Sequence, residues 1–306
     1  MIDKKKKELI AELEKLKKEK NAIILGHNYQ IEEIHEIADY LGDSLGLSQK
    51  AAKTDAEVIV FCGVKFMAES AKILSPEKTV LLPEKEAGCP MAGMIDRQSL
   101  QKKKEEYPEA TVVCYVNTTA EVKAESDICC TSSNAVQVVE SIDAEQVLFV
   151  PDKNLGNYVK ERTDKEVIIW DGYCSTHNRV TPEEIKKVRD KFPQTPILVH
   201  PECKPGVIEL ADYVGSTAGI LDYARNSDSE QLIIGTEKGI IHRMRRENPG
   251  KKFYLLSPRL VCPNMKKINL EKVITSLKNR EYNIELDEDI RKKAFSALKK
   301  MLEITS

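Results

Sequence analysis

The hydrophobic and polar positions change their pattern after the first twenty residues. Residues 3–20 place Leu9, Ile10, Leu13 and Leu16 at helical spacing among Lys and Glu, which predicts an amphipathic surface helix. From residue 21 onward, short apolar runs alternate with helical patterns. The predicted strands are 22–25, 57–61, 79–82, 111–116, 146–150, 166–170, 196–199, 231–234 and 252–255. Because these runs are apolar throughout, they predict parallel strands covered by helices on both faces, and the fold class is α/β.

The α/β pattern also repeats along the chain. His27, Tyr115 and His200, each at or just after the end of a predicted strand, lie 88 and 85 residues apart. We therefore predict three similar αβα-sandwich units with short parallel sheets about a pseudo-threefold axis, rather than the two domains that length alone suggests. The predicted segments are an N-terminal helix (1–20), the three repeats (21–109, 110–195 and 196–275) and a C-terminal helical segment (276–306).

One cysteine follows the last strand of each repeat. Cys89, Cys174 and Cys262 are 85 and 88 residues apart, which matches the repeat period. Three units packed about a common axis would bring equivalent loops together, so we expect these thiols to converge. Three thiolates at one point suit a soft metal or an iron–sulfur cluster.

Zinc is the competing metal. Structural zinc takes four ligands, and the nearest fourth candidate is His177, three residues after Cys174. If His177 closes the site, it is a Cys₃His zinc centre. If it does not, three cysteines leave one iron of a four-iron cluster without a protein ligand, and such an iron is a Lewis acid suited to dehydration.

The first strand of each repeat ends in polar residues of unusual type. Parallel α/β folds bind ligands outside the carboxyl ends of their strands, so these side chains are candidate site residues. They are His27 and Tyr29, Tyr115 and Asn117, and His200 and Glu202.

Serines follow the second short strand of each repeat. Ser44, Ser132 with Ser133 next to it, and the pair Ser216–Thr217 precede helical patterns and are typical of helix N-caps. A helix N-terminus with a hydroxyl is also suited to anions, so these residues could receive carboxylates or a phosphate. The chain has no Walker motif and no convincing G-x-G-x-x-G after a strand, and a nucleotide cofactor is not indicated.

Composition and charge narrow the class of protein. The formal net charge is −2, so no global basic field is available for nucleic acid or an anionic membrane. The longest apolar run, 58–64, is too short to span a bilayer, and the Lys-rich start lacks the apolar region of a signal peptide. We expect a cytoplasmic protein whose eight cysteines are thiols or metal ligands. An iron–sulfur sensor or a zinc-stabilised binding module stays open, with residues 242–246 (HRMRR) as the only basic candidate face.

The motifs together resemble the quinolinate synthases, the A proteins of NAD biosynthesis. The matching segments, in order, are HNYQ (27–30), GDSL (42–45), YVN (115–117), TSSNA (131–135), PDKNLG (151–156) and HPEC (200–203), with the three cysteines. The resemblance implies condensation of iminoaspartate with dihydroxyacetone phosphate to quinolinate, phosphate and two waters. It also implies a [4Fe–4S] cluster on Cys89, Cys174 and Cys262. Some bacterial members carry a C-x-x-C-x-x-C run near the last ligand, where this chain has only Cys262.

The resemblance also implies roles for individual residues. Its substrate-contacting residues carry over to His27, Ser44, Tyr115, Asn117, Ser132, His200, Glu202, Ser216 and Thr217. We expect Tyr29, Glu202 and His200 to be catalytic, with Glu202 and Tyr29 exchanging protons. L-aspartate oxidase or aspartate dehydrogenase is the expected supplier of iminoaspartate. A different cluster-dependent hydro-lyase is the rival enzyme class, and release of phosphate distinguishes the two.

Overall fold

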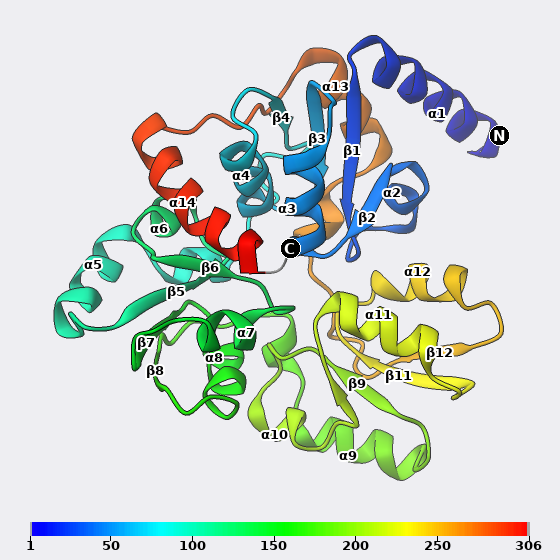
Figure 1. Ribbon diagram of the computed structural model, residues 1–306. Coiled ribbons are helices and arrows are strands. Elements are labelled where there is room, and N and C mark those ends of the chain that lie inside the picture. The colour runs from blue at the N-terminus through cyan, green and yellow to red at the C-terminus, as the bar shows by residue number, and fades with distance from the viewer. Residues whose placement is uncertain (1, 305–306) are drawn as a thin grey trace.

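The computed structural model describes residues 2–304, and its strands form three separate four-stranded parallel sheets (Figure 1). The sheet orders are β2-β1-β3-β4, β6-β5-β7-β8 and β10-β9-β11-β12, so each sheet repeats the same topology. We call the parts of the chain built on these sheets units 1, 2 and 3. The predicted α/β class and the three similar units are confirmed, whereas the residue boundaries between units stay a prediction.

Unit 1 follows the N-terminal helix α1 (Ile2–Glu19). Its elements are β1 (Ala22–His27), α2 (Glu32–Ile37), β2 (Tyr40–Gly42), α3 (Ser44–Lys53), β3 (Val58–Cys62), α4 (Lys65–Leu74), β4 (Thr79–Leu81), the 3₁₀ helix η1 (Met91–Met94) and α5 (Arg97–Glu106). Strand β3 is buried along its whole length, as expected for a parallel strand covered on both faces.

Unit 2 repeats this order of strands and helices. Its elements are β5 (Thr111–Tyr115), α6 (Ala120–Ala124), β6 (Ile128–Cys130), α7 (Ala135–Glu140), β7 (Gln146–Val150), α8 (Lys153–Lys160), β8 (Glu166–Ile169), η2 (His177–Arg179) and α9 (Pro182–Lys191). Helix α9 begins with a capping box, because Thr181 and Glu184 each accept the other's backbone N–H.

Unit 3 and the C-terminal helices complete the chain. Their elements are β9 (Ile197–Val199), α10 (Pro205–Ile208), β10 (Tyr213–Val214), α11 (Thr217–Asn226), β11 (Gln231–Gly235), α12 (Ile240–Glu247), β12 (Lys252–Leu255), η3 (Met265–Lys267), α13 (Leu270–Asn279) and α14 (Glu288–Ile304). Every predicted strand has a counterpart in the structure. The second strand of each unit, β2, β6 or β10, is the short strand expected before the serines; its range is not predicted, because two or three residues are too few to show a period.

The same aspartate contact starts the second strand of each unit. A side-chain oxygen of Asp39, Asp127 or Asp212 accepts a backbone N–H of the first strand, at 2.7, 2.8 and 2.7 Å respectively. Each carboxylate thus provides the first strand with a hydrogen bond that the second strand is too short to provide. The sequence repeat is therefore also a repeat of atomic contacts.

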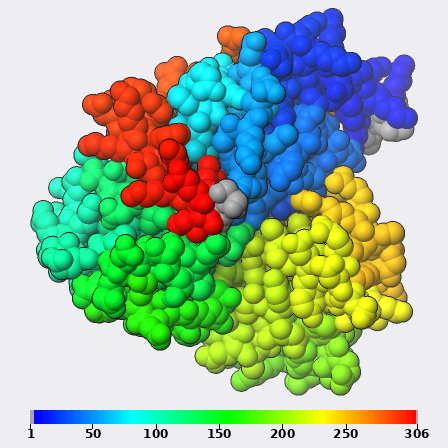
Figure 2. All heavy atoms as spheres, in the orientation of Figure 1, coloured from blue at the N-terminus to red at the C-terminus, as the bar shows by residue number. Residues whose placement is uncertain are grey.

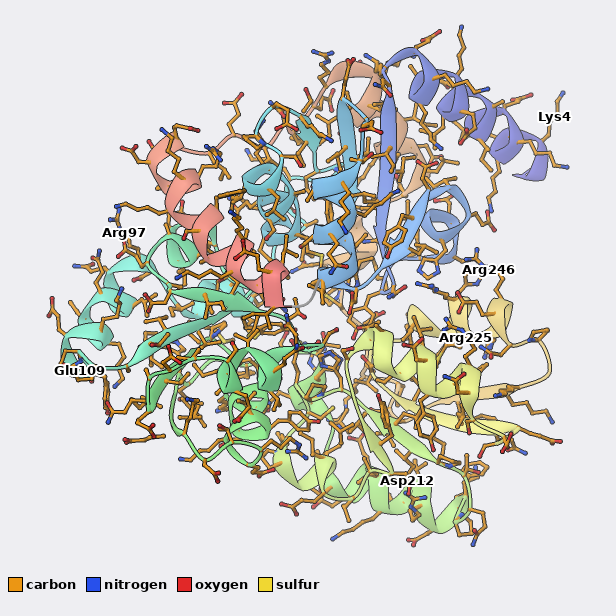
Figure 3. All side chains as sticks on the ribbon, in the orientation of Figure 1. Lys4, Arg97, Glu109, Asp212, Arg225 and Arg246 are labelled. Atoms are coloured by element: carbon orange, nitrogen blue, oxygen red, sulfur yellow. The ribbon has the colours of Figure 1, made fainter. Side chains whose placement is uncertain are left out.

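Helix α14 closes the seam between units 1 and 2. It packs against α6 and β6 of unit 2 and against α4 of unit 1, and Figure 2 shows it lying over the junction of these units. Its buried face contains Ala294, Ala297, Leu298 and Met301. The charged side chains of Glu109 and Asp212, in contrast, lie on the periphery (Figure 3). Among residues 2–304, no helix has both the length and the apolar character that a membrane crossing requires.

Candidate active site

One cavity of about 70 Å³ lies where the three units meet. It opens at the carboxyl ends of the parallel strands, because His27 ends β1, Tyr115 ends β5 and His200 directly follows β9. The predicted site residues that line it are His27, Tyr29, Ser44, Tyr115, Asn117, Ser132, His200, Glu202 and Thr217, with Cys89, Cys174 and Cys262. Equivalent residues of the three repeats, which are 88 and 85 positions apart in the sequence, thus line the same cavity.

Ser216 is the predicted site residue that the cavity lining does not include. Its hydroxyl accepts the backbone N–H of Gly219 at 3.2 Å and caps α11, as the sequence predicted. The cap predictions for the other two serines were wrong. Asp43 caps α3, with Ser44 as the first helical residue, and Asn134 precedes α7. Aspartate is as good a cap as serine, so the local pattern alone could not separate Asp43 from Ser44.

The three thiols reach the cavity from the three units, and each is partly exposed. Burial raises the pKa of Cys89 to about 12 and also raises the pKa values of Cys174 and Cys262. The thiols are therefore protonated in the metal-free chain, and binding of a metal centre releases their protons.

The spacing of these thiols bears on which metal centre they fit. Tetrahedral zinc with Zn–S bonds of about 2.3 Å brings its sulfurs within about 3.8 Å of one another. Among the described residues, the set of Cys, His and carboxylate atoms that all lie within 4.8 Å of one another is Cys174, His177 and Glu202, not the three cysteines. Because each of the three thiols comes from a different unit, they suit a centre with several metal atoms, in which each thiolate binds a different iron.

His27 and His200 repeat one local contact in units 1 and 3. The Nδ1 atom of His27 accepts the N–H of Tyr29 at 3.1 Å, and Nδ1 of His200 accepts the N–H of Glu202 at 3.2 Å. Burial lowers the pKa of both imidazoles to about 3, so both rings are neutral. With Nδ1 occupied as an acceptor, Nε2 carries the proton, and His200 directs it to the Ser132 hydroxyl at 3.1 Å.

Glu202 is a buried carboxylate in the lining of the cavity. Burial alone would raise its pKa, but the imidazoles of His200 and His177 outweigh burial and lower it to about 2. Its oxygens lie 2.6 Å from Nδ1 of His177 and 3.4 Å from Nδ2 of Asn117. Glu202, a residue of unit 3, is therefore ionised and accepts hydrogen bonds from unit 2.

A chain of hydrogen bonds joins Glu202 to Tyr29. Because ionised Glu202 only accepts, Nδ1 of His177 carries the proton and Nε2 accepts from Thr236 at 2.9 Å. Thr236 then accepts from the Tyr29 hydroxyl at 2.5 Å, and Tyr29 accepts from Thr217 at 3.0 Å. Burial raises the pKa of Tyr29 well above its usual value, which keeps the phenol protonated. The arrangement can move a proton between Tyr29 and Glu202.

Sequence reasoning missed Thr236 and treated His177 only as a possible zinc ligand. It also missed Asp152 and Glu237, whose side chains accept the backbone N–H of Cys174 at 2.9 Å and of Cys262 at 3.0 Å. The repeat carried a signal for the last two, since both stand at the same position after the third strand of their units.

Fold and site together define an α/β protein of three parallel sheets whose central cavity combines three thiols with buried acid–base groups. Comparison with known proteins identifies its family. The family model described as quinolinate synthetase A protein matches residues 11–303, and the chain belongs to this family.

Relatives match over nearly their full length. The chain is 58% identical over 297 residues to the quinolinate synthase of Alkaliphilus metalliredigens (strain QYMF), with 97% of this chain and 98% of the relative covered. It is 55% identical over 299 residues to that of Dehalococcoides mccartyi (strain CBDB1), covering 97% and 99%. It is 52% identical over 297 residues to that of Methanosarcina barkeri (strain Fusaro / DSM 804), covering 97% and 98%.

Proposed function

We propose that this chain condenses iminoaspartate with dihydroxyacetone phosphate to quinolinate, inorganic phosphate and two waters. The observation that carries the proposal is the convergence of one cysteine from each unit on a cavity that also holds Glu202, Tyr29 and His200. The family and the names of its relatives support the same reaction.

The thiols of Cys89, Cys174 and Cys262 are proposed to hold a [4Fe–4S] cluster. Their soft donor atoms, one from each unit, support such a group. Held by three cysteines, such a cluster would have one iron without a protein ligand and would supply Lewis acidity toward substrate oxygens.

The chain's own residues bind the anionic groups of the substrates through neutral donors. Among the cavity-lining residues in the described part of the chain there is no Lys or Arg. The hydroxyls of Ser44, Ser132 and Thr217 and the Nε2–H groups of His27 and His200 are therefore proposed to hold the carboxylates and the departing phosphate. Ser44 and Thr217 are the first residues of α3 and α11, where free backbone N–H groups add to anion binding. Ser216 supports Thr217 by capping α11.

Proton transfers are assigned to Glu202 and Tyr29. Substrate carboxylates placed beside Glu202 raise its pKa, because like charges disfavour ionisation, and make it a better base. When His177 holds its proton on Nε2, Nδ1 accepts a proton from Glu202, and the relay through Thr236 returns a proton to the Tyr29 oxygen, which donates to a leaving hydroxyl. Tyr115 and Asn117, which line the cavity beside Glu202, are proposed to orient the intermediate.

Iminoaspartate hydrolyses readily in water, so an enzyme that makes it is the expected neighbour in the cell. We propose L-aspartate oxidase or aspartate dehydrogenase as that supplier, and the cytoplasm as the common compartment.

The test uses protein purified without oxygen. Iron, sulfide and zinc per chain and quinolinate formed from both substrates are measured for the parent and for Cys89→Ala, Cys174→Ala and Cys262→Ala. Cys130→Ala is the matched control, because Cys130 is a fully buried thiol of β6 outside the cavity lining. We expect about four irons and quinolinate in the parent and the control, and loss of both in the three variants.

Two results would contradict the proposal. Zinc without iron, even after reconstitution with iron and sulfide, would point to an ion at Cys174, His177 and Glu202 instead. A cluster without quinolinate or phosphate release would keep the metal centre and assign the chain to another dehydration.

A further inference from the structure

Glu237 is a buried carboxylate that links two parts of the site. It has no exposed surface. Its Oε1 accepts the N–H of Cys262 at 3.0 Å, and its Oε2 accepts the N–H of Gly239 at 2.7 Å and lies 3.0 Å from Nζ of Lys266. The carboxylate therefore holds the loop of one proposed cluster ligand and pairs with a lysine at the same time.

Lys266 extends this link from unit 3 into unit 1. Its ammonium group also donates to the backbone carbonyl of Tyr29, and the side chain is mostly buried. Next to it, the Gln30 amide contacts the Met265 sulfur. Glu237 and Lys266 thus form a continuous bridge from Cys262 to the residue that carries the reactive phenol.

Gly239 packs closely against the backbone of Tyr29 beside this bridge. A Cβ placed on Gly239 would lie 2.7 Å from the Tyr29 carbonyl oxygen, which is backbone and has little freedom to move away. The backbone of Tyr29 is therefore clamped between Lys266 and Gly239 of unit 3.

Unit 2 repeats one of the contacts that Glu237 makes, the one to the cysteine loop. Asp152 accepts the N–H of Cys174, as Glu237 does for Cys262, but its other oxygen caps α8 by accepting the N–H of Leu155. Unit 1 has Gly63 at the equivalent position, so Cys89 has no such carboxylate. The lysine bridge is thus specific to the unit 1–unit 3 boundary and is more than a general feature of the repeat.

We propose that Glu237 and Lys266 are positioning residues that fix the Tyr29 phenol relative to the cysteine loop of unit 3. The inference rests on the proposed function, because it assigns Tyr29 a proton-transfer role. The pair does not touch the reacting atoms; it acts by holding the Tyr29 backbone.

A double-mutant cycle tests whether Lys266 acts through Tyr29. Turnover is measured for the cluster-loaded parent, Lys266→Met, Tyr29→Phe and the variant with both changes. We expect Lys266→Met to lower kcat about 10- to 100-fold through misplacement, with KM within about threefold and iron content unchanged. The variant with both changes should be no slower than Tyr29→Phe alone. Lys266→Met lowers kcat only by moving the phenol hydroxyl, and Tyr29→Phe has already removed that hydroxyl.

Two further variants keep the test clear of folding defects. Lys266→Met leaves Glu237 buried without its cation, so Lys266→Met/Glu237→Gln removes both charges together and should show the same kcat loss. Lys267→Met is the control, because this neighbouring lysine pairs with Glu86 at the surface and should leave kcat unchanged. Losses that multiply in the Lys266–Tyr29 cycle, or iron lost with Lys266→Met, would overturn the proposal.

A readout without turnover separates this inference from the proposed function. A fluorotyrosine at position 29 gives one ¹⁹F resonance in the folded chain. The resonance should shift or broaden in Lys266→Met and in Lys266→Met/Glu237→Gln, and stay in place in Lys267→Met. An unchanged resonance in the first two refutes the positioning role even if the parent forms quinolinate, whereas a parent without quinolinate refutes the proposed function even if the resonance moves.

Discussion

Single residues set the protonation states of this site through short local contacts. In units 1 and 3 a histidine Nδ1 accepts the N–H two residues further on, so the proton of the neutral ring must sit on Nε2. The contact needs only the histidine and the backbone, and it is therefore repeated although the residues that follow, Tyr29 and Glu202, differ. Burial then keeps both rings neutral, as hydrogen-bond donors to anions rather than as cations.

Another buried histidine, His35 of α2, makes stability depend on pH. Burial and the nearby His242 and Arg246 lower its pKa to about 4, and neither ring nitrogen has a hydrogen-bond partner among the described residues. The unfolded chain binds this proton near pH 6.5, so stability falls as the pH drops below 6.5 and levels off near 4. Between pH 7 and 5 the parent should lose about 2 kcal/mol more than His35→Phe, as measured by urea unfolding.

The control for this prediction is His242→Gln, at a partly exposed ring that lies 3.3 Å from Glu32. It should keep most of the parent's pH dependence. Parallel stability curves for the parent and His35→Phe would show that His35 is not the group responsible.

At the scale of elements, each unit places its cysteine by joining two loops. In unit 2, Gly172 pairs with Asp152 as an isolated bridge, and its carbonyl accepts the N–H of Lys153 at 2.8 Å. In unit 3 the N–H of Lys238 donates in the same way to Leu260, two residues before Cys262. In both units, the segment after the third strand is hydrogen-bonded to the loop that follows the fourth strand and holds it in place.

This junction predicts that Gly172→Ala damages the metal site. A Cβ at residue 172 would lie 2.4 Å from the Pro151 carbonyl oxygen, so the backbone on one side must move, and Cys174 moves with it. We expect fewer irons per chain and a lower Tm than in the parent. Gly250→Ala, where a Cβ meets nothing within 4 Å, is the control, and equal iron contents in the two variants would contradict the argument.

At the scale of the whole molecule, the units are held together at their boundaries by both polar and apolar contacts. Polar contacts cross near the cavity: Ser133 donates to Asp43 at 2.6 Å, and Asn154 donates to the Glu202 carbonyl at 3.0 Å. Apolar burial is concentrated further out, where α14 fills the seam between units 1 and 2. The site depends on this assembly, because no unit alone contains all of its groups.

Removal of a large side chain from the buried face of α14 should weaken the seam. Leu298 has no exposed surface, and Leu298→Ala should cost about 2–5 kcal/mol of unfolding free energy, from lost burial plus the cavity left behind. The measurement is chemical unfolding against Lys299→Ala, whose side chain is exposed beside Glu303. Equal stability of the two variants would show that α14 is not part of the cooperative core.

The sequence by itself determined the number of units, their α/β class and the positions that meet in the cavity. Apolar periodicity reports which side of an element is buried, and a repeat of about 85 residues reports equivalent places in similar units. Only the tertiary structure decided which side chains touch. The links from Glu202 through His177 and Thr236 to Tyr29, and from Cys262 through Glu237 and Lys266 to Tyr29, join residues from different units. Such contacts depend on how the units pack, and packing leaves no period in the local pattern.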